Sequence, residues 1–167
     1  MTAYVFTLTV VHVLISLLAI AAGFPVVWGL LKRIPLDRWN AVFLATTVAT
    51  SATGFLFPVA RLLPSHVLSV ISLVLLAVAI YARHGVRLTG LWRPVYAGTA
   101  VAAFYLNFFV LIVQSFLKVP ALRALAPTQT ELPFAGVQLV ALVAFVVIGT
   151  IATLRSRNPV TTVVATR

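Results

Sequence analysis

Acidic residues are almost absent from this chain, and charge of either sign is scarce. Asp, Glu, Lys and Arg make up 8% of the 167 residues, and only Asp37 and Glu131 are acidic. Cysteine does not occur, so a disulfide framework and a thiolate metal site are both excluded. There is also no Gly-rich phosphate loop followed by Lys, no HExxH zinc motif and no EF-hand calcium loop. These absences favour a role other than catalysis.

Apolar residues are abundant instead, at 62% of the chain with a mean hydropathy of +1.15. The few charges divide the sequence into five uncharged runs, which are residues 1–31, 39–60, 62–82, 94–117 and 132–154. Each run exceeds the roughly 20 residues that a helix needs to cross a hydrocarbon layer of about 30 Å. In lipid the backbone polar groups must be satisfied within the segment, so each run is predicted to be a helix.

We therefore predict an all-α integral membrane protein that forms one transmembrane domain over residues 1–167. The predicted architecture is a five-helix transmembrane bundle, with spans at about 4–31, 39–60, 63–82, 94–117 and 133–154. The second run also carries small residues at every fourth position, from Ala41 through Ala45 and Ala49 to Thr53. Such a face lets helices approach closely, so we expect it to be buried against a neighbour.

The basic residues predict how the bundle is oriented. With five spans, nine of the twelve lie on one side, namely Lys32, Arg33, Arg38, Arg83, Arg87, Arg93, Arg155, Arg157 and Arg167. Cytoplasmic loops carry an excess of Lys and Arg, so the N-terminus is predicted outside and the C-terminus inside. The net charge of +10 could also suggest nucleic-acid binding, but this distribution makes the lipid bilayer the expected partner of the protein. The cluster beside Trp92, which consists of Arg83, His84, Arg87 and Arg93, is either a topology signal alone or a site for anionic lipids of the cytoplasmic face.

Polar side chains recur at one depth, near the outer surface. Counting about 20 residues from the basic ends places four of them at this level on four helices. They are His12, His66, Gln114 and Gln138. Asn107 and Lys118 share a helical stripe with Gln114, while the inner half of the bundle is expected to be dry. Polar groups are costly in lipid, so the pattern predicts an outward-facing polar pocket. The alternative is that these residues only bond neighbouring helices or headgroups and never meet.

The segment from Lys118 to Phe134 contains Pro120, Pro127 and Pro133, of which Pro127 and Pro133 limit helix propagation. One interpretation is a lid over the pocket formed by residues 119–133, with Glu131 paired to Lys118, Arg123, Arg61 or a His. The other is an ordinary outer loop in which Pro133 occupies the first turn of the last span.

Several stretches resemble a group of small hypothetical bacterial membrane proteins. They are Thr53–Pro58, Leu63–His66, Tyr105–Asn107, Gln114–Leu122 and Leu125–Gln129. The resemblance covers most of the chain from the second run onward. It implies a multi-pass protein of the bacterial inner membrane, and it assigns no activity to any residue.

Three function classes remain open. The first is binding or transport of a small molecule, with His12, His66, Asn107, Gln114, Lys118, Glu131 and Gln138 as the ligand-binding residues. The second is a redox protein that holds haem b between two axial ligands, His12 and His66. The third is an accessory subunit of a larger membrane complex, which includes assembly with a partner membrane subunit or as a homo-oligomer.

Overall fold

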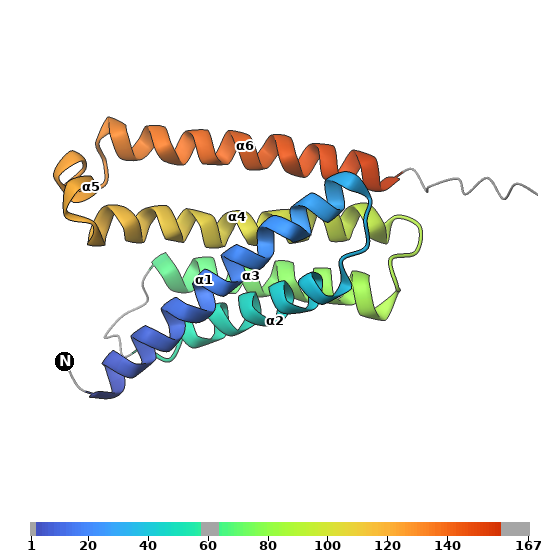
Figure 1. Cartoon of the computed structure of the whole chain (residues 1–167), viewed down its shortest axis with the longest axis horizontal. Coiled ribbons are helices and arrows are strands. Elements are labelled where there is room, and N and C mark those ends of the chain that lie inside the picture. Colours follow the sequence, from blue (N-terminus) through green and yellow to red (C-terminus); the bar gives the residue numbers. More distant parts are fainter. Residues whose placement is uncertain (1–2, 58–63, 158–167) are drawn as a thin grey trace, which may run out of the picture.

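A computed structural model describes residues 3–57 and 64–157 of the chain (Figure 1). The described residues form helices and connecting turns, without a β-strand. In chain order the helices are α1 (Ala3–Lys32), α2 (Asp37–Gly54), α3 (Pro64–Ile80), the π-helix η1 (Tyr81–Gly85), α4 (Trp92–Lys118), α5 (Pro120–Leu125) and α6 (Leu132–Arg157). The prediction of an all-helical protein is therefore confirmed.

Four of these helices are long and apolar enough to cross a membrane: α1, the helix over Ser65–Gly85, α4 and α6. This agrees with a multi-pass membrane protein. The remaining predicted span, the second along the chain at 39–60, overlaps α2. This helix does not qualify by composition because it carries Asp37, Arg38 and Asn40 in its first turn and several Thr and Ser further on. It also ends at Gly54, six residues before the predicted boundary at residue 60. Residues 58–60 of that predicted span lie outside the described part.

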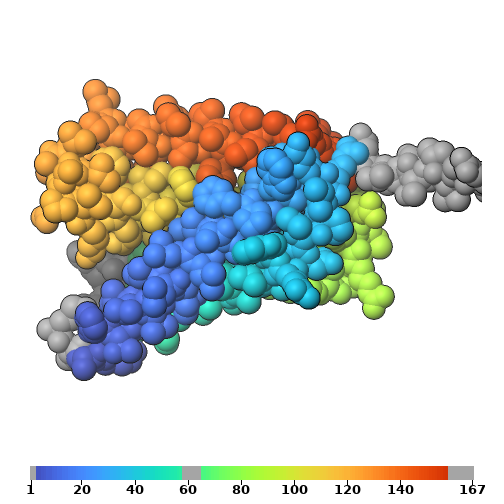
Figure 2. Space-filling view, in the orientation of Figure 1, coloured from blue at the N-terminus to red at the C-terminus, as the bar shows by residue number. Residues whose placement is uncertain are grey.

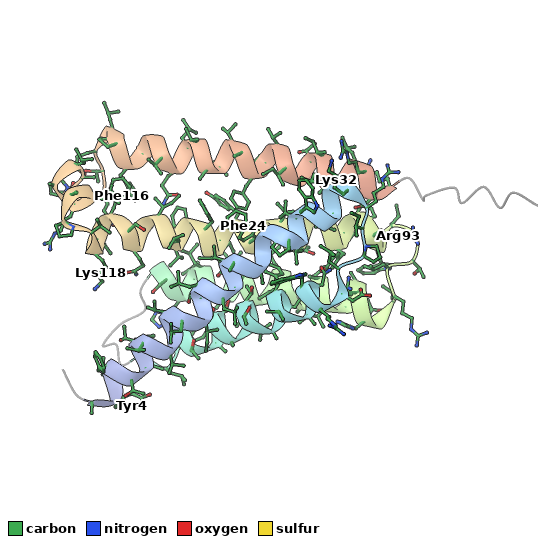
Figure 3. All side chains as sticks on the ribbon, viewed as in Figure 1. Tyr4, Phe24, Lys32, Arg93, Phe116 and Lys118 are labelled. Carbon is green, nitrogen blue, oxygen red and sulfur yellow. The ribbon has the colours of Figure 1, made fainter. Side chains whose placement is uncertain are left out.

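The long helices run between the same two ends of the molecule (Figure 1). Lys32 and Arg93 lie at one of these ends, and Tyr4 and Lys118 lie at the other (Figure 3). We call the end that carries Lys32 and Arg93 the basic end. Basic residues from alternate connections of the sequence therefore lie at opposite ends of the bundle, as Lys32 and Arg93 at one end and Lys118 at the other show (Figure 3).

Helix α4 forms the centre of the core, and Phe104 is its main anchor. The Phe104 ring is 2% exposed and makes edge-to-face contacts with Phe24 of α1, Phe43 of α2 and Phe145 of α6, with ring centroids 5.2, 6.1 and 5.1 Å away. Such aromatic pairs add about 0.5–1.5 kcal/mol each beyond the area that they bury. Gly23 of α1 leaves the space for this ring, since a Cβ atom there would lie 2.5 Å from it. One side chain thus connects four helices.

The predicted small-residue face of α2 is wrong for its first two members. Ala41 and Ala45 are exposed, and the buried stripe of α2 consists of Asn40, Phe43, Leu44, Thr47 and Ser51. Three of these five are polar, and each bonds a partner across the helix interface or in the preceding turn. The face of α2 that packs into the bundle is therefore the one with paired polar groups. The sequence pattern predicts instead that the alanine face packs there.

Candidate functional site

The two predicted haem ligands both lie beside the C-terminal end of α2. The His12 ring on α1 is 2.8 Å from the Thr53 hydroxyl through its Nδ1, and it packs edge-to-face on Phe57. His66 on α3 is 8% exposed and packs against the ring of Phe55, with centroids 5.5 Å apart. Each histidine therefore contacts the end of α2 or the turn that follows it.

Asn107 lies deeper, in the core between α4 and α2. It is 9% exposed and donates a hydrogen bond from Nδ2 to the Thr47 hydroxyl over 3.3 Å. A second polar pair joins α2 to α3, where the Ser51 hydroxyl donates to Ser72 over 3.0 Å. These bonds satisfy buried polar groups between helices, which is the structural alternative considered for Asn107.

The remaining predicted residues belong to α4, α6 and the connection between them. Gln138 of α6 donates from Nε2 to the Phe109 carbonyl at 3.3 Å, whereas the side chains of Gln114 and Lys118 are exposed. Glu131 accepts hydrogen bonds from Thr128 and Thr130 just before α6 begins. The described ion pairs include neither Lys118 nor Arg123 as its partner, and Arg61 lies outside the described residues.

The proposed lid covers a different part of the molecule from the one expected. Helix α5 lies at the end of α4 and α6, apart from the N-terminal half of α1 that carries His12 (Figures 1 and 2). Phe116 of α4 points towards α6 (Figure 3). It packs edge-to-face on Phe134 of α6, and Leu122 and Ala126 belong to the same apolar cluster. The segment therefore closes the α4–α6 pair through its own apolar contacts.

The contacts thus divide the predicted site residues into two groups. His12 and His66 contact α2 or the turn after it, while Gln138 and Glu131 bond within the region of α4, α6 and their connection. Neither of the two cavities described below is lined by any of the seven residues. The haem site and the outer pocket therefore remain predictions from the sequence.

The larger of the two described cavities opens at the basic end and has a volume of about 790 Å³. It is formed by the C-terminal ends of α1 and α6, the N-terminal ends of α2 and α4, and the π-helix η1 with the turn after it. Its charged and titratable lining residues are Arg33, Asp37, Arg83, His84, Arg87, Arg93, Tyr96 and Arg155. Five arginines therefore face one acid in a space large enough for a small molecule. A second, smaller groove of about 410 Å³ lies between α4 and α6 and is mainly apolar.

Arg83 is the cation of this cavity that both forms an ion pair and lies over an aromatic ring. Its side chain is 14% exposed, its guanidinium lies over the Tyr96 ring at 5.4 Å from the ring centroid, and it forms an ion pair with Asp37. Tyr96 is 2% exposed and donates its hydroxyl to the Asn40 side chain. Asn40 in turn donates to the Leu36 carbonyl at 2.8 Å. This chain of contacts fixes the position of the guanidinium, because each member is held by the next.

The backbone around the cavity adopts conformations that are uncommon for residues other than Gly. Of the four described non-Gly residues with positive φ, three line the cavity: Arg33 at 59°, Arg87 at 51° and Leu88 at 55°. Arg33 closes α1, where the Ile34 amide donates to the Gly29 carbonyl over 2.9 Å in the manner of a Schellman cap. The π-helix η1 supplies Arg83 and His84. Such strained turns and π-bulges cluster at functional sites.

The helix ends at the cavity add to its preference for anions. Helix α2 begins here, and the amide groups of its first turn lack intrahelical acceptors, whereas at the start of α4 the Trp92 amide donates to the Thr89 carbonyl and Pro94 has no amide hydrogen. Helices α1 and α6 end here, and Arg155 neutralises part of the α1 end by donating to the Leu31 carbonyl over 2.6 Å. Arg93 donates to the Leu88 carbonyl in the turn after η1 over 2.8 Å. The cavity is therefore suited to an anion, and above all to phosphate or carboxylate, whose geometry matches the guanidinium fork.

Sequence reasoning located the basic residues but not the cavity. It assigned Arg83, Arg87 and Arg93 to the membrane surface and expected the inner half of the bundle to be dry. The missed signal is the polar pair formed by Asn40 and Tyr96, which lie in different runs and meet only in the folded chain.

The described residues contain no group of three or more His, Cys, Asp or Glu side chains that could hold a metal ion. No protein-family model matches this chain, and comparison with curated proteins and with solved structures gives no significant match either.

Proposed function

We propose that this chain is a five-span membrane protein that binds a small anionic molecule in the cavity at its basic end. The observation that carries the proposal is the convergence of five arginines, with a single acid, on one cavity of about 790 Å³. Random surface charge would spread these side chains apart, because like charges repel. Here the ends of α1 and α6, the start of α4, and η1 with the turn after it bring them together, and Arg83 is held in place by buried aromatic and amide groups.

The proposal places the basic end in the cytoplasm of a bacterial cell, with the N-terminus outside. It is supported by the positive charge at this end and by the two exposed tryptophans near it, Trp28 and Trp39. Lys32 lies over the Trp28 ring at 5.0 Å, as expected of an anchor at the headgroup level. Anionic lipids of that leaflet are then the natural surroundings of the cavity mouth.

The proposal counts α2 as the fifth span. Its 18 residues give a length of about 27 Å, close to the thickness of a hydrocarbon core. Its Thr53, Ser51 and Thr47 side chains bond α1, α3 and α4 respectively, so α2 avoids the cost of exposing these three groups to lipid. In Figure 1 it runs beside α1 and α3 between the two ends of the bundle.

A pair of single-cysteine variants tests the span count. Ile34 precedes α2 and Leu56 follows it, both are exposed, and the natural chain has no cysteine to interfere. In intact cells an impermeant thiol reagent should label Leu56→Cys and leave Ile34→Cys unlabelled until the membrane is opened. Labelling of both, or of neither, before opening would show that α2 does not cross the membrane.

Binding is tested with the purified full chain, titrated with inorganic phosphate and with an alkyl phosphate in detergent. Arg83→Gln should weaken binding by about tenfold or more, because it removes a charge-assisted, partly buried contact. Arg38→Gln is the matched control, since Arg38 is exposed at the same end but does not line the cavity. Equal loss in both variants would mean that only net charge matters, and the proposed site would be wrong.

A further inference from the structure

The ion pair between Arg83 and Asp37 is unequal in burial. The Arg83 side chain is 14% exposed, whereas that of Asp37 is 80% exposed. The guanidinium is held over Tyr96 and cannot leave the cavity without losing that contact. The carboxylate lies in the first turn of α2, at the surface, and water can solvate it fully when it moves away. The pair therefore has one fixed member and one displaceable member.

Asp37 is also the only acid that lines the cavity. An incoming anion that reaches Arg83 must take the position of the Asp37 carboxylate or share the guanidinium with it. Exposed ion pairs are weak because both partners are well solvated when separated. A ligand with two negative charges can replace this carboxylate at Arg83 and contact a second arginine at the same time, which a single carboxylate cannot do.

The lining also contains an apolar wall. Val26 and Leu30 come from the end of α1, Ile34 from the turn after α1, and Leu88 from the turn after η1. A ligand that fills the cavity therefore meets arginine forks on one part of its surface and aliphatic side chains on another. An organic phosphate monoester has this chemistry, since its phosphate carries close to two negative charges at neutral pH and its ester group supplies the apolar part.

We infer that the ligand is a phosphate monoester with an apolar body, and that Asp37 is an internal competitor which occupies Arg83 until the phosphate displaces it. The inference rests on the proposed function, because it concerns the same cavity. It goes further by assigning the ligand class and by giving Asp37 a regulatory role. Removal of this acid should therefore strengthen binding, where loss of a binding residue would weaken it.

The variants Asp37→Asn and Glu131→Gln test the inference as a matched pair. Asp37 and Glu131 are the two acids of the chain, and each substitution changes the net charge by the same amount. Glu131 does not line the cavity and is bonded to Thr128 and Thr130. Asp37→Asn should lower the Kd for octyl phosphate by about two- to fivefold. This is the change in Kd that corresponds to losing the competing interaction of one exposed ion pair. Glu131→Gln should leave the Kd unchanged.

Titrations are read by calorimetry and by tryptophan fluorescence, to which Trp92 contributes. The Trp92 ring packs on Tyr81, the first residue of the π-helix that carries Arg83. Tighter binding by Asp37→Asn alone supports the inference. If the natural chain binds octyl phosphate and Asp37→Asn binds with the same Kd, Asp37 is not a competitor and the proposed function stands. If both acid variants tighten binding equally, net charge is the cause and both ideas fail. Absence of binding by the natural chain also rejects both.

A second set of titrations distinguishes a lipid phosphate from a soluble phosphate as the ligand. The chain is placed in phosphatidylcholine nanodiscs with or without phosphatidic acid, and the octyl phosphate titration is repeated. A lipid ligand should raise the apparent Kd for octyl phosphate in the discs that contain phosphatidic acid, and this effect should be larger for Asp37→Asn. A soluble ligand should give the same Kd in both discs. An octyl carboxylate that binds as tightly as octyl phosphate would overturn the assignment of the ligand class.

Discussion

The fit of Phe104 against Gly23 gives a sharp test of the packing. A Cβ atom at position 23 would lie 2.5 Å from the Cδ2 and Cε2 atoms of the Phe104 ring, below the closest approach of real Cβ atoms. The ring cannot swing aside, because it is 2% exposed and contacts aromatic side chains of three other helices. Gly23→Ala must therefore separate α1 from α4.

The magnitude follows from two opposing effects. Overpacking of a closely packed core costs about 1–3 kcal/mol. Replacing Gly by Ala in a helix returns up to about 1 kcal/mol through backbone entropy. We expect Gly23→Ala to lower the free energy of unfolding by about 1–2 kcal/mol as the difference of the two. The measurement is the loss of helical circular dichroism in detergent on heating or on addition of a denaturing detergent.

Gly98→Ala is the matched control within α4. A Cβ atom there would meet the Thr153 hydroxyl at 3.5 Å, which is an ordinary contact, so the variant should be as stable as the natural chain or slightly more stable. A second check combines Gly23→Ala with Phe104→Leu. The double variant should lose less stability than the two single variants together, because the smaller side chain removes the clash. Additive losses, or a Gly23→Ala protein as stable as Gly98→Ala, would refute the packing described here.

Three further outcomes are expected. Tyr96→Phe leaves Asn40 without its buried donor and should cost about 1–3 kcal/mol in the same unfolding assay, with weaker phosphate binding; unchanged stability and binding would argue against this contact. Desolvation would raise the pKa of the Glu131 carboxyl, but hydrogen bonds led by those from Thr128 outweigh it and lower the pKa. The resulting stabilisation of the turn before α6 should be complete above the ordinary Glu pKa of about 4.3 and be lost as the pH falls through the lowered pKa, measured by hydrogen exchange. Glu131→Gln should remove this pH dependence. Ala45→Leu should change thermal stability in detergent little because Ala45 is exposed, and a marked loss would show a partner helix on that face.

The sequence was sufficient to predict the helices, because lipid leaves the backbone few alternatives. Long uncharged runs must satisfy their own amide groups, so the first, fourth and last predicted spans agree with α1, α4 and α6 to within a few residues at each end. Boundaries were less certain where the chain is less apolar. Gly54 ends α2 early, and the same polar composition keeps α2 from qualifying as a span by composition alone.

The contacts of the polar residues could not be read from depth along the chain. Counting residues gives a height in the bundle but not the direction in which a side chain points around it. His12 and Gln138 were expected at the same level, yet one bonds α2 and the other bonds α4. Helical spacing fixed which residues share a face of one helix, and the rotation of each helix against its neighbours was needed to know what that face meets.

The cavity at the basic end shows the same division most clearly. The sequence alone determined that Arg33, Arg83, Arg93 and Arg155 lie at one end, since charge is excluded from the hydrocarbon core. Only the tertiary structure decided that these side chains converge on one space and that Arg83 lies over Tyr96. The physical reason is that avoidance of lipid acts on each segment separately, whereas a site depends on how helices distant in sequence pack together.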